Sequence, residues 1–131
     1  GLANQAESVT ADDGLELTDA WVTSAVKCAP PGNTPTATER DACSGFLERE
    51  FGALGPVRVV VCLGTFGFDA ALRRFGVRPK PRFGHGVEVA VDQGPTLLGC
   101  YHVSQQNTFT GRLTEPMLDA VFRRAVDLAN A

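Results

Sequence analysis

PVRVVVCLG, at residues 56–64, has the composition of a strand that is buried on both faces. A near-continuous run of valines suits a parallel strand covered by helices on both sides, because such a strand has no solvated face. Gly64 and Gly67 then turn the chain, and we expect a helix from about Phe68 to Phe75. This strand–turn–helix unit predicts an α/β fold.

Strands and helices alternate along the rest of the chain. Residues 20–26 are rich in β-branched and aromatic side chains and are expected to form a strand. Two more short strands are expected at residues 87–91 and 97–102. This alternation predicts a three-layer α/β/α sandwich around a mostly parallel sheet. Ligands bind such sheets beyond the carboxyl ends of the strands, which directs attention to the loops at residues 27–35 and 102–113.

Two helices carry their own start signals. Thr36 precedes Glu39 at the spacing of a capping box. Thr114 is expected to cap the last helix, whose apolar residues recur at helical spacing on one face. These residues are Leu118, Val121, Phe122, Ala125 and Leu128.

Length and charge exclude several classes of protein. The 131 residues are enough for one domain, residues 1–131. A net charge of −3 and a pI near 5.3 argue against a broad basic surface, so any contact with nucleic acid must be local. No apolar run reaches the roughly 18 residues of a membrane span, and no secretory signal is present. We therefore expect a cytoplasmic protein, and a monomer.

The loop HVSQQNTFTGRLT, at residues 102–114, is more polar than a chain reversal requires. Such a loop suits a site for a polar ligand, and nucleic acid is the favoured one. His102 is either a structural residue or a functional one, and its position at the end of a strand favours the functional interpretation. The basic cluster at residues 78–82 either touches phosphates or is a solvated loop. His85, between two glycines, is expected to be exposed.

The four cysteines fall into two classes. Cys28 follows the first expected strand and Cys43 lies in the next helix. A loop that bends back would bring both sulfurs to one zinc ion or iron–sulfur cluster, although two thiolates are only half of such a site. Cys62 and Cys100 lie in expected strands and are predicted to be core thiols.

Two stretches together resemble the iron–sulfur uracil-DNA glycosylases. The first is VTSAVKCAPPGNTPT at residues 22–36, followed by Glu39, Arg40 and Cys43, and the second is the loop at residues 102–114. With both, the chain is most similar to the type-5 class of bacteria and archaea. The resemblance implies a [4Fe–4S] cluster with Cys28 and Cys43 as two of its four ligands. It also implies an N-terminal segment, absent here, that carries the other two ligands and the first active-site motif.

The resemblance further implies roles for individual residues. His102 resembles the donor to uracil O2 in the leaving base, and Ser24 and Ser104 resemble substrate-binding residues. The family usually has proline where this chain has Val103. Type-4 relatives carry asparagine at the Ser24 position, where it reads the uracil edge, so a broader range of deaminated bases is expected. The residues implied to contact DNA are Gln105, Gln106, Asn107, Thr108 and Arg112.

The sequence therefore predicts a DNA-repair glycosylase that hydrolyses the N-glycosidic bond of uracil, after the base has left the stack. This chain is expected to be the C-terminal two-thirds of the domain, without the cluster or most of the activity by itself. One alternative is a non-catalytic DNA- or nucleotide-binding domain of the same fold. Another is a small α/β module in which all four cysteines bind zinc.

Overall fold

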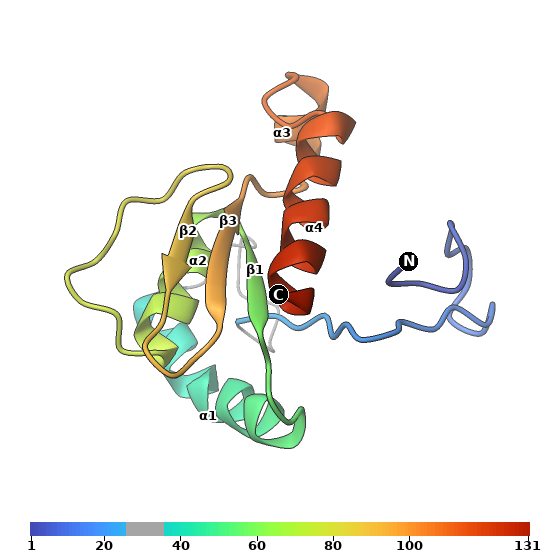
Figure 1. Ribbon diagram of the computed structural model, residues 1–131. Coiled ribbons are helices and arrows are strands. Elements are labelled where there is room, and N and C mark those ends of the chain that lie inside the picture. The colour runs from blue at the N-terminus through green and yellow to red at the C-terminus, as the bar shows by residue number, and fades with distance from the viewer. Residues whose placement is uncertain (26–35) are drawn as a thin grey trace.

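A computed structural model describes residues 1–25 and 36–131 of the protein (Figure 1), with the side chains of Arg40, Cys43 and Ser44 left out. Seven regular elements follow one another in the described ranges. They are helix α1 (Ala37–Ala53), strand β1 (Val59–Leu63), helix α2 (Gly64–Arg74), strands β2 (Glu88–Ala90) and β3 (Thr96–Cys100), and helices α3 (Gln105–Phe109) and α4 (Glu115–Asn130).

The three strands of the described residues form one sheet in the order β1-β3-β2. β1 and β3 are parallel, with Leu63 opposite Cys100, whereas β2 and β3 are antiparallel, with Val89 opposite Leu97. The sheet is therefore mixed, and the expectation of a mostly parallel sheet holds for only one of its two strand pairs. The short connection at residues 91–95 is the reason, because a few residues can join antiparallel neighbours but cannot cross over to a parallel one.

Helices cover both faces of the sheet, as the α/β/α prediction requires (Figure 1). On one face, Phe68 and Leu72 of α2 pack with Leu97 of β3. On the other face, Val121 of α4 packs with Leu98 of β3. Leu97 and Leu98 are both buried because successive side chains of a strand point to opposite faces.

The two predicted helix caps are confirmed. Thr36 Oγ1 accepts a hydrogen bond from the backbone N–H of Glu39 at 3.2 Å, and the Glu39 carboxylate accepts one from the Thr36 N–H at 3.3 Å. Thr114 Oγ1 accepts from the Met117 N–H at 3.4 Å. α2 begins four residues earlier than predicted, because Gly64 takes a φ of +80° and turns the strand directly into the helix.

The strand expected at residues 20–26 is wrong over its described part. Residues 20–25 have no strand pairing, and Trp21 and Val22 are 62% and 78% exposed. Their β-branched and aromatic composition favours a strand only where a neighbouring strand is available for pairing. Here the segment runs instead as an extended arm (Figure 1). Trp21 Nε1 donates to the Glu50 carboxylate at 3.4 Å, and the Thr23 hydroxyl donates to the same carboxylate, so the arm is held at the last turns of α1.

Candidate functional site

His102 lies where two parallel strands end side by side. Leu63 of β1 is opposite Cys100 of β3, so Gly64 and His102 follow at the same edge of the sheet. The two residues are in close contact, since a Cβ added to Gly64 would lie 3.2 Å from His102 Cβ. His102 is exposed, and no hydrogen bond to its ring is found within residues 1–25 and 36–131. The sheet edge therefore presents an imidazole, without a hydrogen-bond partner among these residues, directly beside the N-terminus of α2.

The loop after His102 is shaped by its own polar side chains. Ser104 caps the short helix α3 by accepting from the Asn107 N–H at 3.3 Å. The Asn107 amide donates to the carbonyl oxygen of His102 at 2.9 Å, and the Thr108 hydroxyl donates to that of Ser104 at 3.1 Å. The sequence did not predict α3, because serine, asparagine and threonine suit a cap as well as a ligand site. Ser104, Asn107 and Thr108 thus each use at least one side-chain polar group in a hydrogen bond that holds the loop in shape.

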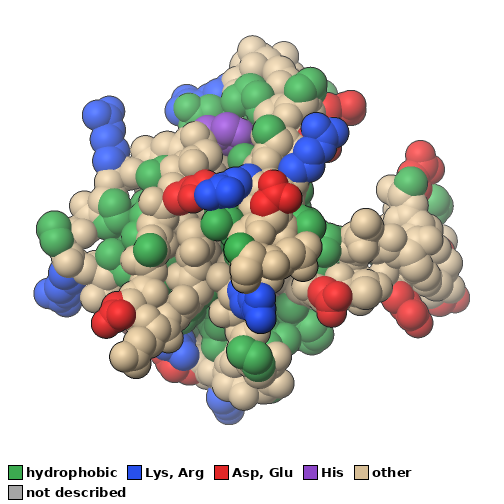
Figure 2. All heavy atoms as spheres, viewed as in Figure 1, with side chains coloured by type: hydrophobic (Ala, Val, Ile, Leu, Met, Phe, Trp, Pro, Cys, Tyr) green, Lys and Arg blue, Asp and Glu red, His purple; other side chains and the backbone are tan. Residues whose placement is uncertain are grey.

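Other side chains of the loop face outward. Gln105 and Gln106 are exposed on α3, and Phe109, at the end of the same helix, is 82% exposed. The guanidinium of Arg112 lies over the ring of Tyr101, 4.8 Å from its centroid. Phe109 was missed by the sequence analysis, although an aromatic residue inside a polar run is a signal for a contact surface. In Figure 2 the cationic and anionic side chains of the visible face are interspersed, which agrees with a local rather than a broad contact surface.

His85 is not exposed, contrary to the expectation from its two glycine neighbours. Its ring is half-buried, accepts a hydrogen bond from the Tyr101 N–H at Nδ1 (3.0 Å) and lies 3.2 Å from the carbonyl oxygen of Met117 at Nε2. The close approach of the backbone explains Gly99, since a Cβ there would lie 2.6 Å from the Gly84 oxygen, whereas Gly86 is explained by its φ of +81°. The sequence signal for this close approach was the glycine at position 99, inside an expected strand.

Ser24 is not brought beside His102. It follows Thr23, which is held at Glu50 in α1, and the chain after α1 leads into the amino end of β1. His102 follows the opposite, carboxyl end of β3. Ser24 is exposed and has an interaction of its own.

The prediction that Cys62 and Cys100 are core thiols is confirmed, whereas the pairing of Cys28 with Cys43 stays a prediction. Cys28 lies outside the described residues, and Cys43 lies in α1 with its side chain not described. Cys62 and Cys100 are buried in the cores on opposite faces of the sheet. Burial raises the pKa of the Cys62 thiol to about 12 and also raises the pKa of the Cys100 thiol. Because the two sulfurs lie in separate cores on opposite faces of the sheet, they cannot ligate one metal ion together, which removes the four-cysteine zinc module.

Metal-ligating side chains do not cluster elsewhere in the described part of the chain. No group of three or more His, Cys, Asp or Glu residues there is arranged to hold an ion. A helix long and apolar enough to cross a membrane is also absent from these residues.

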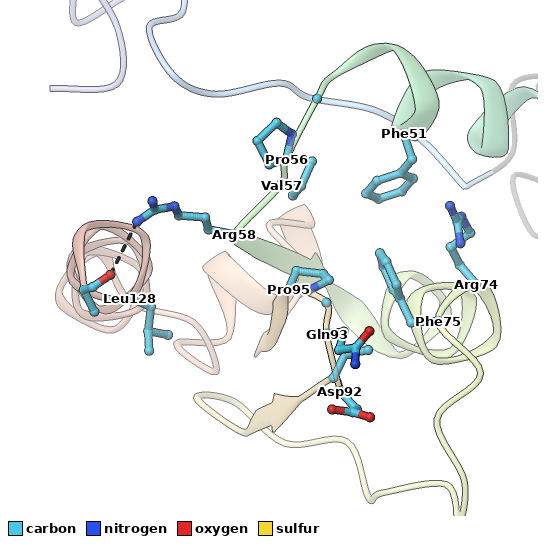
Figure 3. Close-up of a pocket in the computed structure, with 14 residues that line it drawn as sticks. Phe51, Pro56, Val57, Arg58, Arg74, Phe75, Asp92, Gln93, Pro95 and Leu128 are labelled. Atoms are coloured by element: carbon cyan, nitrogen blue, oxygen red, sulfur yellow. Dashed lines mark hydrogen bonds between the residues drawn. The ribbon is translucent and has the colours of Figure 1, made fainter.

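A pocket of about 700 Å³ lies at the opposite end of the sheet (Figure 3). Its two cations are already engaged. Arg58 donates to the carbonyl oxygens of Ala129 and Ala131 at the end of α4, at 2.8 and 3.4 Å. Arg74 pairs with Glu48 at 3.0 Å, and its guanidinium lies 5.5 Å from the ring centroid of Phe51. Both arginines of this pocket at the amino ends of β1 and β3 are therefore already paired with acceptors of the protein itself.

Comparison with known proteins agrees with the resemblance found in the two sequence stretches. A family model described as the uracil DNA glycosylase superfamily matches residues 1–126. Similar proteins named type-5 uracil-DNA glycosylase occur in Mycobacterium tuberculosis (52% identical, over 98% of this chain and 49% of that protein), Thermus thermophilus (45%, over 98% and 59%) and Pyrobaculum aerophilum (46%, over 95% and 54%). The chain spans about half the length of the curated relatives it matches. On this evidence the chain belongs to the uracil DNA glycosylase superfamily.

Proposed function

We propose that the protein is a DNA-repair glycosylase that hydrolyses the N-glycosidic bond of uracil in DNA. The observation that carries the proposal is the exposed imidazole of His102, set on Gly64 at the shared carboxyl edge of β1 and β3. Relatives 45–52% identical are named for this activity. A base must leave the DNA stack before such chemistry, and the edge of the sheet is open to receive it.

His102 stabilises the leaving base in this proposal. Breaking the bond between sugar and uracil leaves negative charge on the base, chiefly at O2, while the sugar becomes oxocarbenium-like. A hydrogen-bond donor aimed at that oxygen lowers the barrier by a few kcal/mol. The first turn of α2 begins beside His102, at Gly64, and its unpaired N–H groups favour anionic charge at the same place. Water then completes the hydrolysis, with no covalent enzyme intermediate.

The loop at residues 102–114 is the proposed DNA contact. Gln105 and Gln106 on α3 are exposed and are the side chains we assign to the opened duplex. Phe109 adds an exposed aromatic face on which a base can stack. Arg112, over Tyr101, supplies a cation for a phosphate. Thr108 and Asn107 hold the loop in shape, and the Ser104 hydroxyl still has a proton to donate to substrate or phosphate.

We propose that Ser24 binds the substrate base and widens the range of bases in the DNA-bound protein, which requires its segment to leave Glu50 and reach the carboxyl edge beside His102. A hydroxyl cannot make the two simultaneous contacts that an asparagine amide makes with the edge of uracil. We therefore expect release of other deaminated bases, such as hypoxanthine, besides uracil. A panel of duplexes that differ only in the damaged base measures this, and Ser24→Asn should narrow the range. Release confined to uracil by the wild-type protein would contradict this role.

A [4Fe–4S] cluster is the proposed cofactor, with Cys28 and Cys43 as two of its thiolate ligands. The donor chemistry fits, since cysteine thiolates hold such clusters and the other two cysteines are buried core thiols. When bound, the cluster would be structural and would fix the chain around residues 27–36. Cys43→Ser should lower the iron content of the purified natural protein. Thr38→Ala, a change on the exposed surface of the same helix, should leave the iron content unchanged.

The first experiment is single-turnover release of uracil from a labelled duplex by the full natural protein. We expect wild-type release and a roughly 10²- to 10³-fold slower rate for His102→Ala, with little change in DNA affinity. Asp119→Asn, an exposed change in α4, serves as the control. Tight binding of uracil-containing DNA without release would instead favour the non-catalytic DNA-binding domain.

DNA is the proposed partner, and its uracil arises by deamination in the chromosome. The relatives come from bacteria and archaea, in which chromosomal DNA lies in the cytoplasm. We therefore propose a cytoplasmic location and action as a monomer.

A further inference from the structure

The ring of His85 takes the place of a strand residue at the end of β3. Backbone hydrogen bonds continue beyond the β2–β3 pairs, from Gly99 N–H to the Val87 oxygen and from Gly86 N–H to the Gly99 oxygen, both at 2.8 Å. The next N–H of β3 in this series belongs to Tyr101, and it donates to His85 Nδ1 at 3.0 Å. A side-chain nitrogen thus accepts the bond that a backbone carbonyl would accept in a longer strand.

The second nitrogen of the same ring contacts α4. Nε2 lies 3.2 Å from the carbonyl oxygen of Met117, in the first turn of that helix. Because Nδ1 accepts from a backbone N–H, the ring proton must be on Nε2, which donates it to Met117. Tyr101 immediately precedes the loop at residues 102–114, and Met117 closely follows it. One neutral imidazole therefore joins the two ends of the loop that carries His102.

The contacts continue from this ring into the loop. The Tyr101 ring lies 4.9 Å from the His85 ring, and the Arg112 guanidinium lies on Tyr101. The loop backbone then closes on itself, since the Leu113 N–H donates to the Asn107 oxygen at 3.0 Å. His85 itself belongs to the segment before β2, far from the loop in sequence. Its position couples that segment to Tyr101 and Met117, the residues that flank the loop, through two hydrogen bonds and one ring contact.

We propose that His85 is a positioning residue that clamps the ends of the loop at residues 102–114 and so fixes the place of His102 at the sheet edge. The link to catalysis rests on the proposed function, whereas the clamp itself does not. The clamp needs both nitrogens. If His85 acts as a clamp, the loss of either hydrogen bond should release the loop almost as fully as the loss of both. The reason is that the ring holds the two ends of the loop together only while it is bonded to each of them.

Three variants of the full natural protein test the clamp. His85→Phe keeps an aromatic ring beside Tyr101 and loses both hydrogen bonds. His85→Asn keeps an acceptor near the Nδ1 position, and His85→Gln keeps a donor near the Nε2 position. His102→Ala is the matched control, because it changes the other histidine and leaves the clamp intact.

The first readout is amide hydrogen exchange of the free protein over residues 101–113. We expect roughly tenfold faster exchange in the phenylalanine variant, since net hydrogen bonds of ordinary strength are lost. The asparagine and glutamine variants should exchange within about threefold of it, while peptides from β1 and α2 stay as protected as in the wild type. Unchanged exchange over residues 101–113, or effects of the two single-bond variants that simply add up to the phenylalanine effect, would overturn the proposal.

The second readout is single-turnover uracil release. All three variants should slow it by roughly 10- to 100-fold, as expected when a reacting group is misplaced by about 1 Å, with DNA affinity changed much less. His102→Ala should slow release with no change in exchange. If the wild-type protein releases no uracil, the proposed function fails, and the exchange measurements still decide the clamp separately.

Discussion

The two ends of the central sheet differ in what they leave unpaired. The amino end has a pocket of about 700 Å³, but Arg58 and Arg74 there are engaged by helix carbonyls and by Glu48. The carboxyl end, after β3, presents an imidazole without a hydrogen-bond partner in the described residues, together with the exposed Gln105 and Gln106. We therefore propose the carboxyl end as the functional site although the larger pocket lies at the amino end, because ligands of such sheets bind beyond the carboxyl ends of parallel strands.

The largest loss of stability at the carboxyl end is expected from a substitution of Gly99. A Cβ there would lie 2.6 Å from the backbone oxygen of Gly84 and 2.7 Å from Val87 Cγ1, so the segment around His85 must move. We expect Gly99→Ala to lower the free energy of unfolding by about 3 kcal/mol, the upper range for overpacking. Urea unfolding measures it. Gly67→Ala, with nothing within 4 Å of the new Cβ and a place inside α2, should be neutral or stabilising by up to about 1 kcal/mol.

A pair of glycines, one at each end of the sheet, compares the two ends directly. Gly64→Ala forces a side chain into a φ of +80° and within 3.2 Å of His102 Cβ. Single-turnover uracil release should fall roughly 10- to 100-fold, because the imidazole is displaced. Gly94→Ala creates a tighter contact, 2.8 Å from Val91 Cγ1, but at the amino end. It should lower stability and leave release unchanged. Equal loss of activity from both variants would mean that general destabilisation, not the position of His102, explains the effect.

Features set by neighbouring residues were predictable from the sequence. The capping box of Thr36 and Glu39, the cap at Thr114 and the strand β1 depend on short-range patterns, and the structure confirms them. The burial of β1 is less complete than predicted, since Cys62 is buried and the other residues of the strand are half-buried. The orientation of β2 was open to the same reasoning, because only five residues, 91–95, connect it to β3. The expected strand at residues 20–26 failed because strand propensity says nothing about whether a partner strand is available.

For the candidate site too, features set by neighbouring residues were predictable, whereas features set by residues distant in sequence were not. The position of His102 at the carboxyl end of a strand was predicted, because the run of strand-forming residues at 97–102 ends there. The role of His85 was not, because it depends on Tyr101 and Met117, which are distant in sequence. Within the loop, composition alone did not separate Ser104 and Asn107, which hold α3, from Gln105 and Gln106, which face outward. That separation needs coordinates, since the same residue types serve both purposes.

A smaller effect is expected from Arg58, which holds the end of α4 at the amino end of the sheet. Its guanidinium donates to the carbonyl oxygens of Ala129 and Ala131, a favourable place for a cation at a helix C-terminus. Arg58→Ala should lower the free energy of unfolding by about 0.5–1 kcal/mol, because the contact is exposed to solvent. Uracil release at saturating protein should not change. A rate of uracil release that is slower by tenfold or more would indicate that the pocket at the amino end contributes to function.

The smallest expected effect concerns Glu88, which joins β2 to the middle of α4. The Arg124 guanidinium donates two hydrogen bonds to its carboxylate, at 2.5 and 3.0 Å, and this holds the pKa of Glu88 below its ordinary value of 4.5. A lowered pKa in the folded state means that the pair stabilises the protein fully above pH 4.5 and loses that contribution as the pH falls further. Wild-type stability should therefore decline slightly more steeply below pH 4.5 than that of Arg124→Gln, as followed by urea unfolding at a series of pH values. Since both side chains are solvent-exposed, the two profiles should converge in high salt, and a difference that survives there would have to come from packing of α4 rather than from the ion pair.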